Sequence, residues 1–199
     1  MNLRGKTLVL ASHNAGKLKE LTNKLDPFDV TLLPLTYYGI EAPEETGTTF
    51  EANATLKAKN AALKTGEWAL ADDSGLKVKA LGGRPGVYSA DWGGEEQDFK
   101  KAVSRIHDEL LEISDPDWSA AFECCLALSD PQGNVTLFKG EIEGAIVMPA
   151  RGSQNFGYDA AFQPLGYTKT FGEMAFEEKQ NTRHHRMVAV EQFLNTCFK

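Results

Sequence analysis

The sequence has few cysteines, no long apolar run and too little positive charge to suit several classes of protein. Its three cysteines are an odd number, and no spacing among them resembles a zinc or redox motif. Nothing therefore indicates a disulfide framework, and a reducing compartment, the cytoplasm, is expected. The apolar run at 8–11 is too short for a signal sequence or a membrane span, so no membrane partner is expected.

The charge balance argues against binding to duplex nucleic acid. The chain carries 21 Lys and Arg against 28 Asp and Glu, a formal net charge of −7. Proteins that hold a polyanion by bulk electrostatics need an excess of positive charge. A small anionic ligand remains compatible with this composition, because a few lysines and one metal ion can reverse the potential locally.

The hydrophobic pattern alternates between helical and strand periods over 199 residues, enough for one domain or two closely joined lobes. The expected elements are a strand at 6–11, a helix at 15–25, a short apolar run at 30–33, helices at 49–63 and 95–111, a β-hairpin formed by 120–128 and 135–147, and a helix at 186–198. Mixed elements with antiparallel excursions indicate an α+β or mixed-sheet fold with a cleft.

Asp72-Asp73-Ser74-Gly75 directly follows the apolar run 68–71, which is typical of a buried strand. Open α/β sheets place ligands at the carboxyl ends of their strands. Neighbouring carboxylates need a compensating cation, and a hard metal ion such as Mg²⁺ provides one. An Asx turn or helix cap is the alternative use of the same four residues, and the pattern alone does not decide between them.

Two further segments could bind the phosphates and the metal. Ser12 to Lys17 joins the first strand to a helix, where backbone N–H groups, a glycine and a lysine favour an anion. A simple capped helix with a solvated lysine explains the same residues. Glu44 and Glu45 lie in a polar loop and could complete a metal shell begun by Asp73, or be solvated.

Two later segments could bind an organic base. The stretch 155–159 combines two aromatic residues with a glycine and a carboxylate, which suits stacking on a base and reading its edge, although such aromatics also occur in cores. Lys179 and the cluster 184–186 could bind a second anion or a carbonyl oxygen, or form a solvated basic turn.

Taken together, these segments resemble the inosine triphosphate pyrophosphatase family over nearly the whole chain. No single motif is specific for this family, but the order and spacing of all of them together are specific. The matching motifs are Ser12-x-Asn14-x-x-Lys17 with Glu20, Glu44-Glu-Thr-Gly47, Thr49-Phe50 with Asn53-Ala54, Asp72-Asp-Ser-Gly-Leu76, Leu81-Gly-Gly-x-Pro-Gly86, Tyr88-Ser-Ala90, Phe156-Gly-Tyr-Asp159, Glu173-Met174, Glu178-Lys179 and His185-Arg186.

The resemblance implies a single nucleoside triphosphate pyrophosphatase domain over 1–199, with a two-lobed α/β fold. A central mixed β-sheet would be flanked by helices, with an active-site cleft between the lobes, and two copies would form a homodimer. It also implies Mg²⁺-dependent hydrolysis of a non-standard purine nucleoside triphosphate to the monophosphate and pyrophosphate. Asp73 would be the catalytic base, and Glu44 and Asp73 the metal ligands. The implied substrate-binding residues are Ser12, His13, Asn14, Ala15, Gly16, Lys17, Ser74, Phe156, Gly157, Tyr158, Asp159, Lys179, His185 and Arg186.

The sequence departs from the family pattern at several positions. Ala52 stands where the family has a glutamate, with Glu51 one place early, and Asp91 replaces an arginine. One extra residue after Lys179 lets either His184 or His185 take the family's histidine position; the arginine that follows favours His185. A nucleotide-binding protein with weak or lost hydrolysis is therefore an alternative, and a pyrophosphatase for modified pyrimidines is a third.

Overall fold

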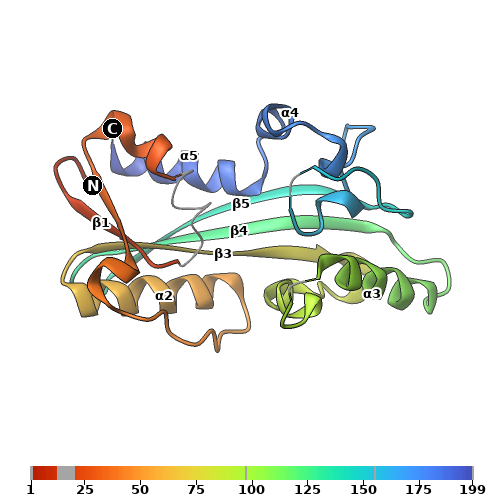
Figure 1. Ribbon diagram of the computed structural model, residues 1–199, viewed down its shortest axis with the longest axis horizontal. Coiled ribbons are helices and arrows are strands. Elements are labelled where there is room, and N and C mark those ends of the chain that lie inside the picture. Colours follow the sequence, from red (N-terminus) through yellow and green to blue (C-terminus); the bar gives the residue numbers. More distant parts are fainter. Residues whose placement is uncertain (1, 13–20, 97, 155, 199) are drawn as a thin grey trace. The chain divides into compact units, whose positions relative to one another are not determined.

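The strands form one mixed sheet in the part of the chain that the computed structural model describes, residues 2–12, 21–96, 98–154 and 156–198. The strands are β1 (Thr7–Leu10), β2 (Thr31–Pro34), β3 (Trp68–Val78), β4 (Ser119–Ser129), β5 (Val135–Ile146) and β6 (Phe162–Pro164). Their order is β2-β1-β3-β4-β5-β6, and Figure 1 labels β1, β3, β4 and β5. β1 is parallel to β2 and β3, whereas β6 is antiparallel to β5, which confirms the expected mixed α/β sheet.

Two of the main helices begin at residues whose side chains cap them. The main helices are α2 (Phe50–Thr65), α3 (Phe99–Leu111), α4 (Phe176–Asn181) and α5 (His185–Cys197). The Thr49 side chain accepts the Ala52 N–H at the start of α2. Asp98 accepts the Lys100 N–H, so α3 begins later than the position 95 predicted from the sequence. Of the helix expected at 15–25, residues 21–25 are helical and 13–20 lie outside the described residues.

The expected hairpin is formed by β4 and β5, which are neighbours in the sheet. The Asp130 carboxylate stabilises the connecting turn by accepting the N–H groups of Gln132 at 2.9 Å and Asn134 at 2.8 Å. Such side-chain bonds to the following backbone are the reason that aspartate favours turns. Both strands are long enough to contribute to each of the two compact units into which the contacts divide the chain.

Unit 1 comprises Met1–Asp73, Cys125–Lys139 and Ala189–Lys199. Within this unit, α2 and the C-terminal part of α5 lie on opposite sides of the strands (Figure 1). The small-residue stripe predicted for α2 is buried, because it allows the helix to approach the sheet closely. The buried members of the stripe are Phe50, Ala54, Ala58, Ala61 and Ala62.

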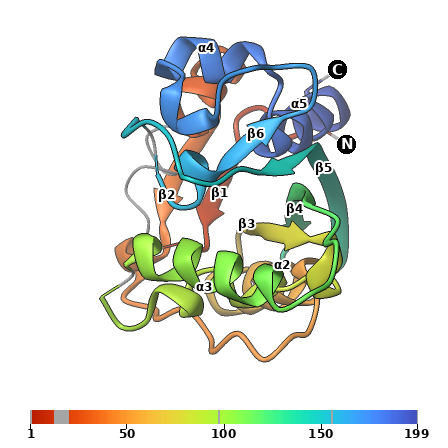
Figure 2. The same ribbon diagram turned by 90° about the vertical axis from the view of Figure 1, so that its right-hand side faces the viewer.

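Unit 2 comprises Ser74–Cys124 and Gly140–Val188 and has its own core. Its strands have α3 on one side and α4 on the other, and β6 forms the edge of the sheet beside β5 (Figure 2). The apolar face predicted for α3, with Ala102, Val103, Ile106 and Leu110, is buried in this core. Within the described ranges, no helix combines the length and hydropathy needed to cross a membrane.

Candidate functional site

Asp72 and Asp73 lie within β3, which continues without a turn to Val78. The sequence suggested a strand ending at Ala71, so both the turn interpretation and the placement at a strand end are wrong. The strand continues because Leu76 and Val78 extend its buried face into the core of unit 2. Two carboxylates that are 4 % and 8 % exposed are thereby held on a rigid element rather than on a loop.

Two polar side chains of α2 contact the Asp73 carboxylate in unit 1. Asn53 Nδ2 donates to Asp73 Oδ2 at 3.0 Å, and Lys57 Nζ lies 3.9 Å from Asp73 Oδ1. Lys57 Nζ also donates to Glu45 Oε1 at 2.8 Å. Asn53 and Lys57 are four positions apart on α2, so they share a helix face and both reach β3.

The loop that carries Glu44 and Glu45 is attached to the same asparagine. The Gly47 N–H donates to Asn53 Oδ1 at 2.7 Å, which fixes the amide orientation and leaves its NH₂ group for Asp73. A Cβ at position 47 would lie 2.5 Å from Asn53 Oδ1, so this close approach requires glycine. Glu44, the carboxylate favoured as a metal ligand, is exposed, and its neighbour Glu45 is the one that binds Lys57.

The electrostatics of this cluster favour an added cation. Burial raises the pKa of Asp73 to about 6; Lys57 and the Asn53 hydrogen bond oppose the rise, whereas Glu45 and Asp72 add to it. Among the described residues that shift this pKa, acidic groups thus outnumber the ammonium group of Lys57, and their oxygens are the ligands that a hard divalent cation prefers. Within the described residues no three acidic, His or Cys side chains form a ready metal shell. The donor set therefore fits an ion that also takes water or phosphate oxygens.

Sequence reasoning missed Lys57, assigned no role to Asn53, and considered Glu45 only as a metal ligand or a solvated residue, not as the partner of Lys57. The available signal was two polar residues at helical spacing on the small-residue face of α2, because a buried polar side chain needs a specific partner. Glu51, one place early for a metal ligand, instead forms an ion pair with Lys139 of β5, and this contact lowers the pKa of Glu51.

Unit 2 brings together several of the residues predicted to bind the base. Arg186 Nη2, in the first turn of α5, donates to Ser74 Oγ at 3.1 Å. Lys179 Nζ of α4 is 2.5 Å from Asp159 Oδ2, and Asp159 is almost fully buried. The same carboxylate accepts the Phe156 N–H at 3.0 Å and so folds the loop around Gly157, whose φ is +70°. These four side chains form two cation–oxygen pairs on elements far apart in the sequence.

The aromatic residues of that loop have opposite environments. Phe156 is 69 % exposed and Tyr158 is 2 % exposed, and both rings pack edge-on against Phe99 at centroid distances of 4.9 and 5.3 Å. The exposed ring offers a stacking surface, whereas the buried ring belongs to the core. His184 and His185 are also buried, and His185 stacks on Phe122 with ring centroids 5.1 Å apart.

The predicted phosphate-binding segment is described only at its start. Ser12 follows β1 and is partly exposed. His13, Asn14, Ala15, Gly16 and Lys17 lie outside the described residues. Their roles, and the choice between the two histidines, stay predictions.

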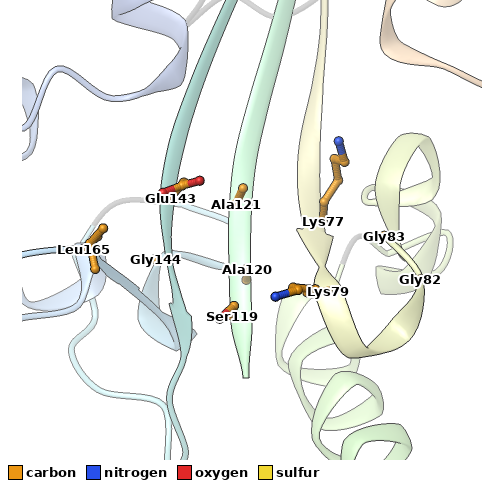
Figure 3. A pocket seen from close by; sticks show the side chains of 10 residues that line it. All are labelled: Lys77, Lys79, Gly82, Gly83, Ser119, Ala120, Ala121, Glu143, Gly144 and Leu165. Atoms are coloured by element: carbon orange, nitrogen blue, oxygen red, sulfur yellow. The ribbon is translucent and has the colours of Figure 1, made fainter. Parts of the chain in front are cut away.

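A separate hollow of about 580 Å³ lies on the sheet of unit 2 (Figure 3). Of the predicted site residues that the structure describes, none lines this hollow. Its two lysines each have an acidic neighbour: Lys77 Nζ is 2.9 Å from Glu123, and Lys79 Nζ is 2.8 Å from Asp117. The lining residues are Lys77, Lys79, Gly82, Gly83, Ser119, Ala120, Ala121, Glu143, Gly144 and Leu165.

Comparisons with known proteins agree over nearly the whole chain. The model of the Ham1 family matches residues 8–196. The chain is 44 % identical to a dITP/XTP pyrophosphatase of Rhizobium meliloti, with 96 % of both chains covered. It is 46 % identical to one of Ruegeria pomeroyi, covering 98 % of this chain and 96 % of that one. A HAM1 protein from Coxiella burnetii superposes with a TM-score of 0.91 at 35 % identity, covering 96 % of this chain and 98 % of the other.

Proposed function

Because the chain belongs to the Ham1 family, we propose that it hydrolyses non-standard purine nucleoside triphosphates. The substrates are dITP, ITP and XTP or dXTP, and the products are the monophosphate and pyrophosphate. The names of similar proteins that cover nearly the whole chain support this reaction. Its consequence is removal of these nucleotides from the pool before they enter DNA or RNA.

Asp73 carries the proposed mechanism, because it is a buried carboxylate whose pKa of about 6 suits a general base near neutrality. It takes a proton from water as the water oxygen attacks the α-phosphorus, and the bond to the departing pyrophosphate breaks. The Asn53 amide orients the carboxylate, and Lys57 limits the rise of its pKa. Asp73 with Glu44 would hold Mg²⁺, which supplies neutralisation of the leaving group's charge.

The phosphates and the purine require different donors. We assign the triphosphate to Ser12, His13, Asn14, Ala15, Gly16 and Lys17. In unit 2, the cationic groups of Lys179 and Arg186 suit a 6-oxo purine, because they donate hydrogen bonds to O6. Adenine would leave such donors facing an amino group, which rejects it. Phe156 offers its exposed ring for stacking on the base, and His185 is the remaining residue that we assign to substrate binding.

An assay of pyrophosphate and monophosphate release across ITP, dITP, XTP, GTP and ATP, with Mg²⁺ and after chelation, tests the proposal. We expect release from the first three substrates and none from ATP, and loss of release after chelation. Tight ITP binding without release of pyrophosphate would instead support a nucleotide-binding protein. That alternative is considered because Ala52 stands where the family has a glutamate. Faster turnover of dTTP or UTP than of ITP would contradict the purine assignment.

A homodimer is part of the proposal, and the hollow of unit 2 is the face that suits it. On β4 the small side chains Ser119 and Ala121 lie between two lysines on one side, Lys77 of β3 and Lys79 directly after β3, and Glu143 of β5 on the other (Figure 3). A twofold axis through β4 would set the lysines of each copy opposite the glutamate of the other.

Charge reversal tests this face. Glu143→Lys should convert a dimer to monomer in sedimentation at micromolar concentration, and adding Lys79→Glu should restore the dimer. A dimer unaffected by Glu143→Lys would exclude the face, and a monomeric wild-type protein would exclude the dimer.

The extent of the domain and its compartment complete the proposal. Both units are discontinuous in sequence, and β3, β4 and β5 contribute residues to each of them. This interleaving supports a single domain over residues 1–199. The three cysteines are buried and in no disulfide, which agrees with a cytoplasmic location.

A further inference from the structure

Ser89 joins β3 and the turn at Gly86, both near it in the sequence, to Tyr158, which is 69 positions away. Its Oγ accepts the Leu76 N–H at 2.9 Å and donates to the Gly86 carbonyl at 2.6 Å. Its main-chain carbonyl accepts the Tyr158 hydroxyl at 2.7 Å. Ser89 is 7 % exposed, so these bonds are shielded from water and are costly to leave unmade.

One end of this connection is the stretch of β3 that begins with Ser74. Leu76 lies two positions after Ser74, whose Oγ accepts from Arg186. The Leu76 N–H is satisfied by the Ser89 hydroxyl, and that hydroxyl in turn holds the loop at Gly86. The path of β3 beside Ser74 therefore depends on Ser89.

The other end is the loop 156–159. Tyr158 has almost no exposed surface, so its side chain has little area to offer a ligand. Phe156, by contrast, is exposed, and the carboxylate of the buried Asp159 holds the ammonium group of Lys179. The Tyr158 hydroxyl anchors the loop to Ser89, while Phe99 packs against both aromatic rings. The loop thus has a fixed buried side and an open side.

We propose that Tyr158 and Ser89 are positioning residues, which set the loop of Phe156 and Asp159 against the Ser74 segment and do not themselves contact the purine. This inference rests on the proposed function of that loop in binding the base. Tyr158, which the family resemblance implies is a substrate-binding residue, would then hold the residues that contact the substrate and make no contact itself. Recognition of the base then depends on how rigidly the Tyr158–Ser89 hydrogen bond holds the loop.

Tyr158→Phe is the direct test, because it removes one hydroxyl and keeps the ring that packs on Phe99. We expect KM for ITP to rise about tenfold while kcat changes by less than about threefold, since a loosened loop weakens substrate and transition state equally. The dissociation constant of inosine monophosphate, measured by calorimetry, should rise by a similar factor. That second measurement does not depend on hydrolysis.

Two further variants separate positioning from the alternatives. Ser129→Ala is the matched control, because Ser129 in unit 1 is also buried and its Oγ donates to a main-chain carbonyl at 3.1 Å; both constants should be unchanged. Ser89→Ala should act like Tyr158→Phe, and the double variant should not exceed the larger single effect, because both loosen one junction.

The outcomes are distinct for the inference and for the function on which it rests. Unchanged inosine monophosphate binding in Tyr158→Phe overturns the inference while leaving hydrolysis by the wild-type protein intact. Additive effects in the double variant also overturn it, because they indicate separate roles. A wild-type protein that releases no pyrophosphate fails the proposed function, and one that does not bind inosine monophosphate overturns the inference as well.

Discussion

Replacing Asp73 with asparagine should remove activity and increase stability at neutral pH. Asparagine keeps the shape of the side chain and an oxygen that can accept the Asn53 hydrogen bond, but it carries no charge to bury. Removing a positioned general base costs about 10²- to 10⁴-fold in kcat. Opposite effects on activity and stability are expected of a residue that serves the reaction at the expense of the fold.

The size of the stability effect follows from the pKa of Asp73. Ionising this group is harder in the folded protein, where burial raises its pKa from 3.8 to about 6. Because one pKa unit corresponds to ~1.4 kcal/mol, the cost at pH 8 is at most about 3 kcal/mol, and remaining solvent contact reduces it to about 1–2 kcal/mol. Asp73→Asn should therefore raise Tm by roughly 2–8 °C.

The pH dependence has a defined sign. Between pH 3.8 and about 6 the folded state holds more protons on Asp73 than the unfolded state. The contribution of Asp73 to the free energy of unfolding therefore falls as the pH rises through this window. Below the window Asp73→Asn and the wild-type protein should have similar stability, and above it the variant should be the more stable.

Urea denaturation between pH 4 and pH 8, with a chelator present, measures this difference. Asp130→Asn is the control of opposite sign, because hydrogen bonds from Asn134 and neighbouring backbone lower the pKa of Asp130, so its variant should lose stability at neutral pH. An Asp73→Asn protein less stable than wild type at pH 8 would refute the argument. Near-wild-type turnover would show that Asp73 is not the base.

Two further substitutions test neighbours of this cluster. Glu51→Gln removes the ion pair with Lys139, so it should lower the free energy of unfolding, measured by urea denaturation, by only about 0.5 kcal/mol and leave turnover unchanged. A large loss of turnover would instead indicate that Glu51 is a metal ligand. Lys57→Met removes the cation that opposes the rise in the pKa of Asp73, so the variant should hold a proton on Asp73 to higher pH. A pH–rate profile should therefore show kcat/KM reduced on the order of tenfold at pH 6 and less at pH 8. Equal losses at both pH values would contradict an electrostatic effect.

Periodicity and capping residues were sufficient to predict most of the elements. The stripes of α2 and α3 and the hairpin turn at Asp130 depend on local spacing, so they could be read directly. The start of α3 was misplaced because the capping role of Asp98 was overlooked. The family motifs then provided the candidate site, because their order carries information that no single motif holds.

The remaining features depend on tertiary contacts. Asp72-Asp73-Ser74-Gly75 has the composition of a turn, and only packing of Leu76 and Val78 in unit 2 explains why it lies within β3. Lys57 reaches Asp73 from another element, and the hydroxyl of Tyr158 reaches Ser89 across a long stretch of sequence. Local pattern cannot indicate such partners.

The interleaving of unit 1 has a consequence for biosynthesis. Its last stretch, Ala189–Lys199, comes from the far end of the sequence, yet Phe193 in that stretch is fully buried with its ring 5.6 Å from Phe138. Cys197 O accepts the N–H of Leu3 at 3.1 Å. β1 and β2 therefore leave the ribosome long before the helix that covers them has been translated. During that interval their apolar faces are open to aggregation, and chaperones would bind the nascent chain there.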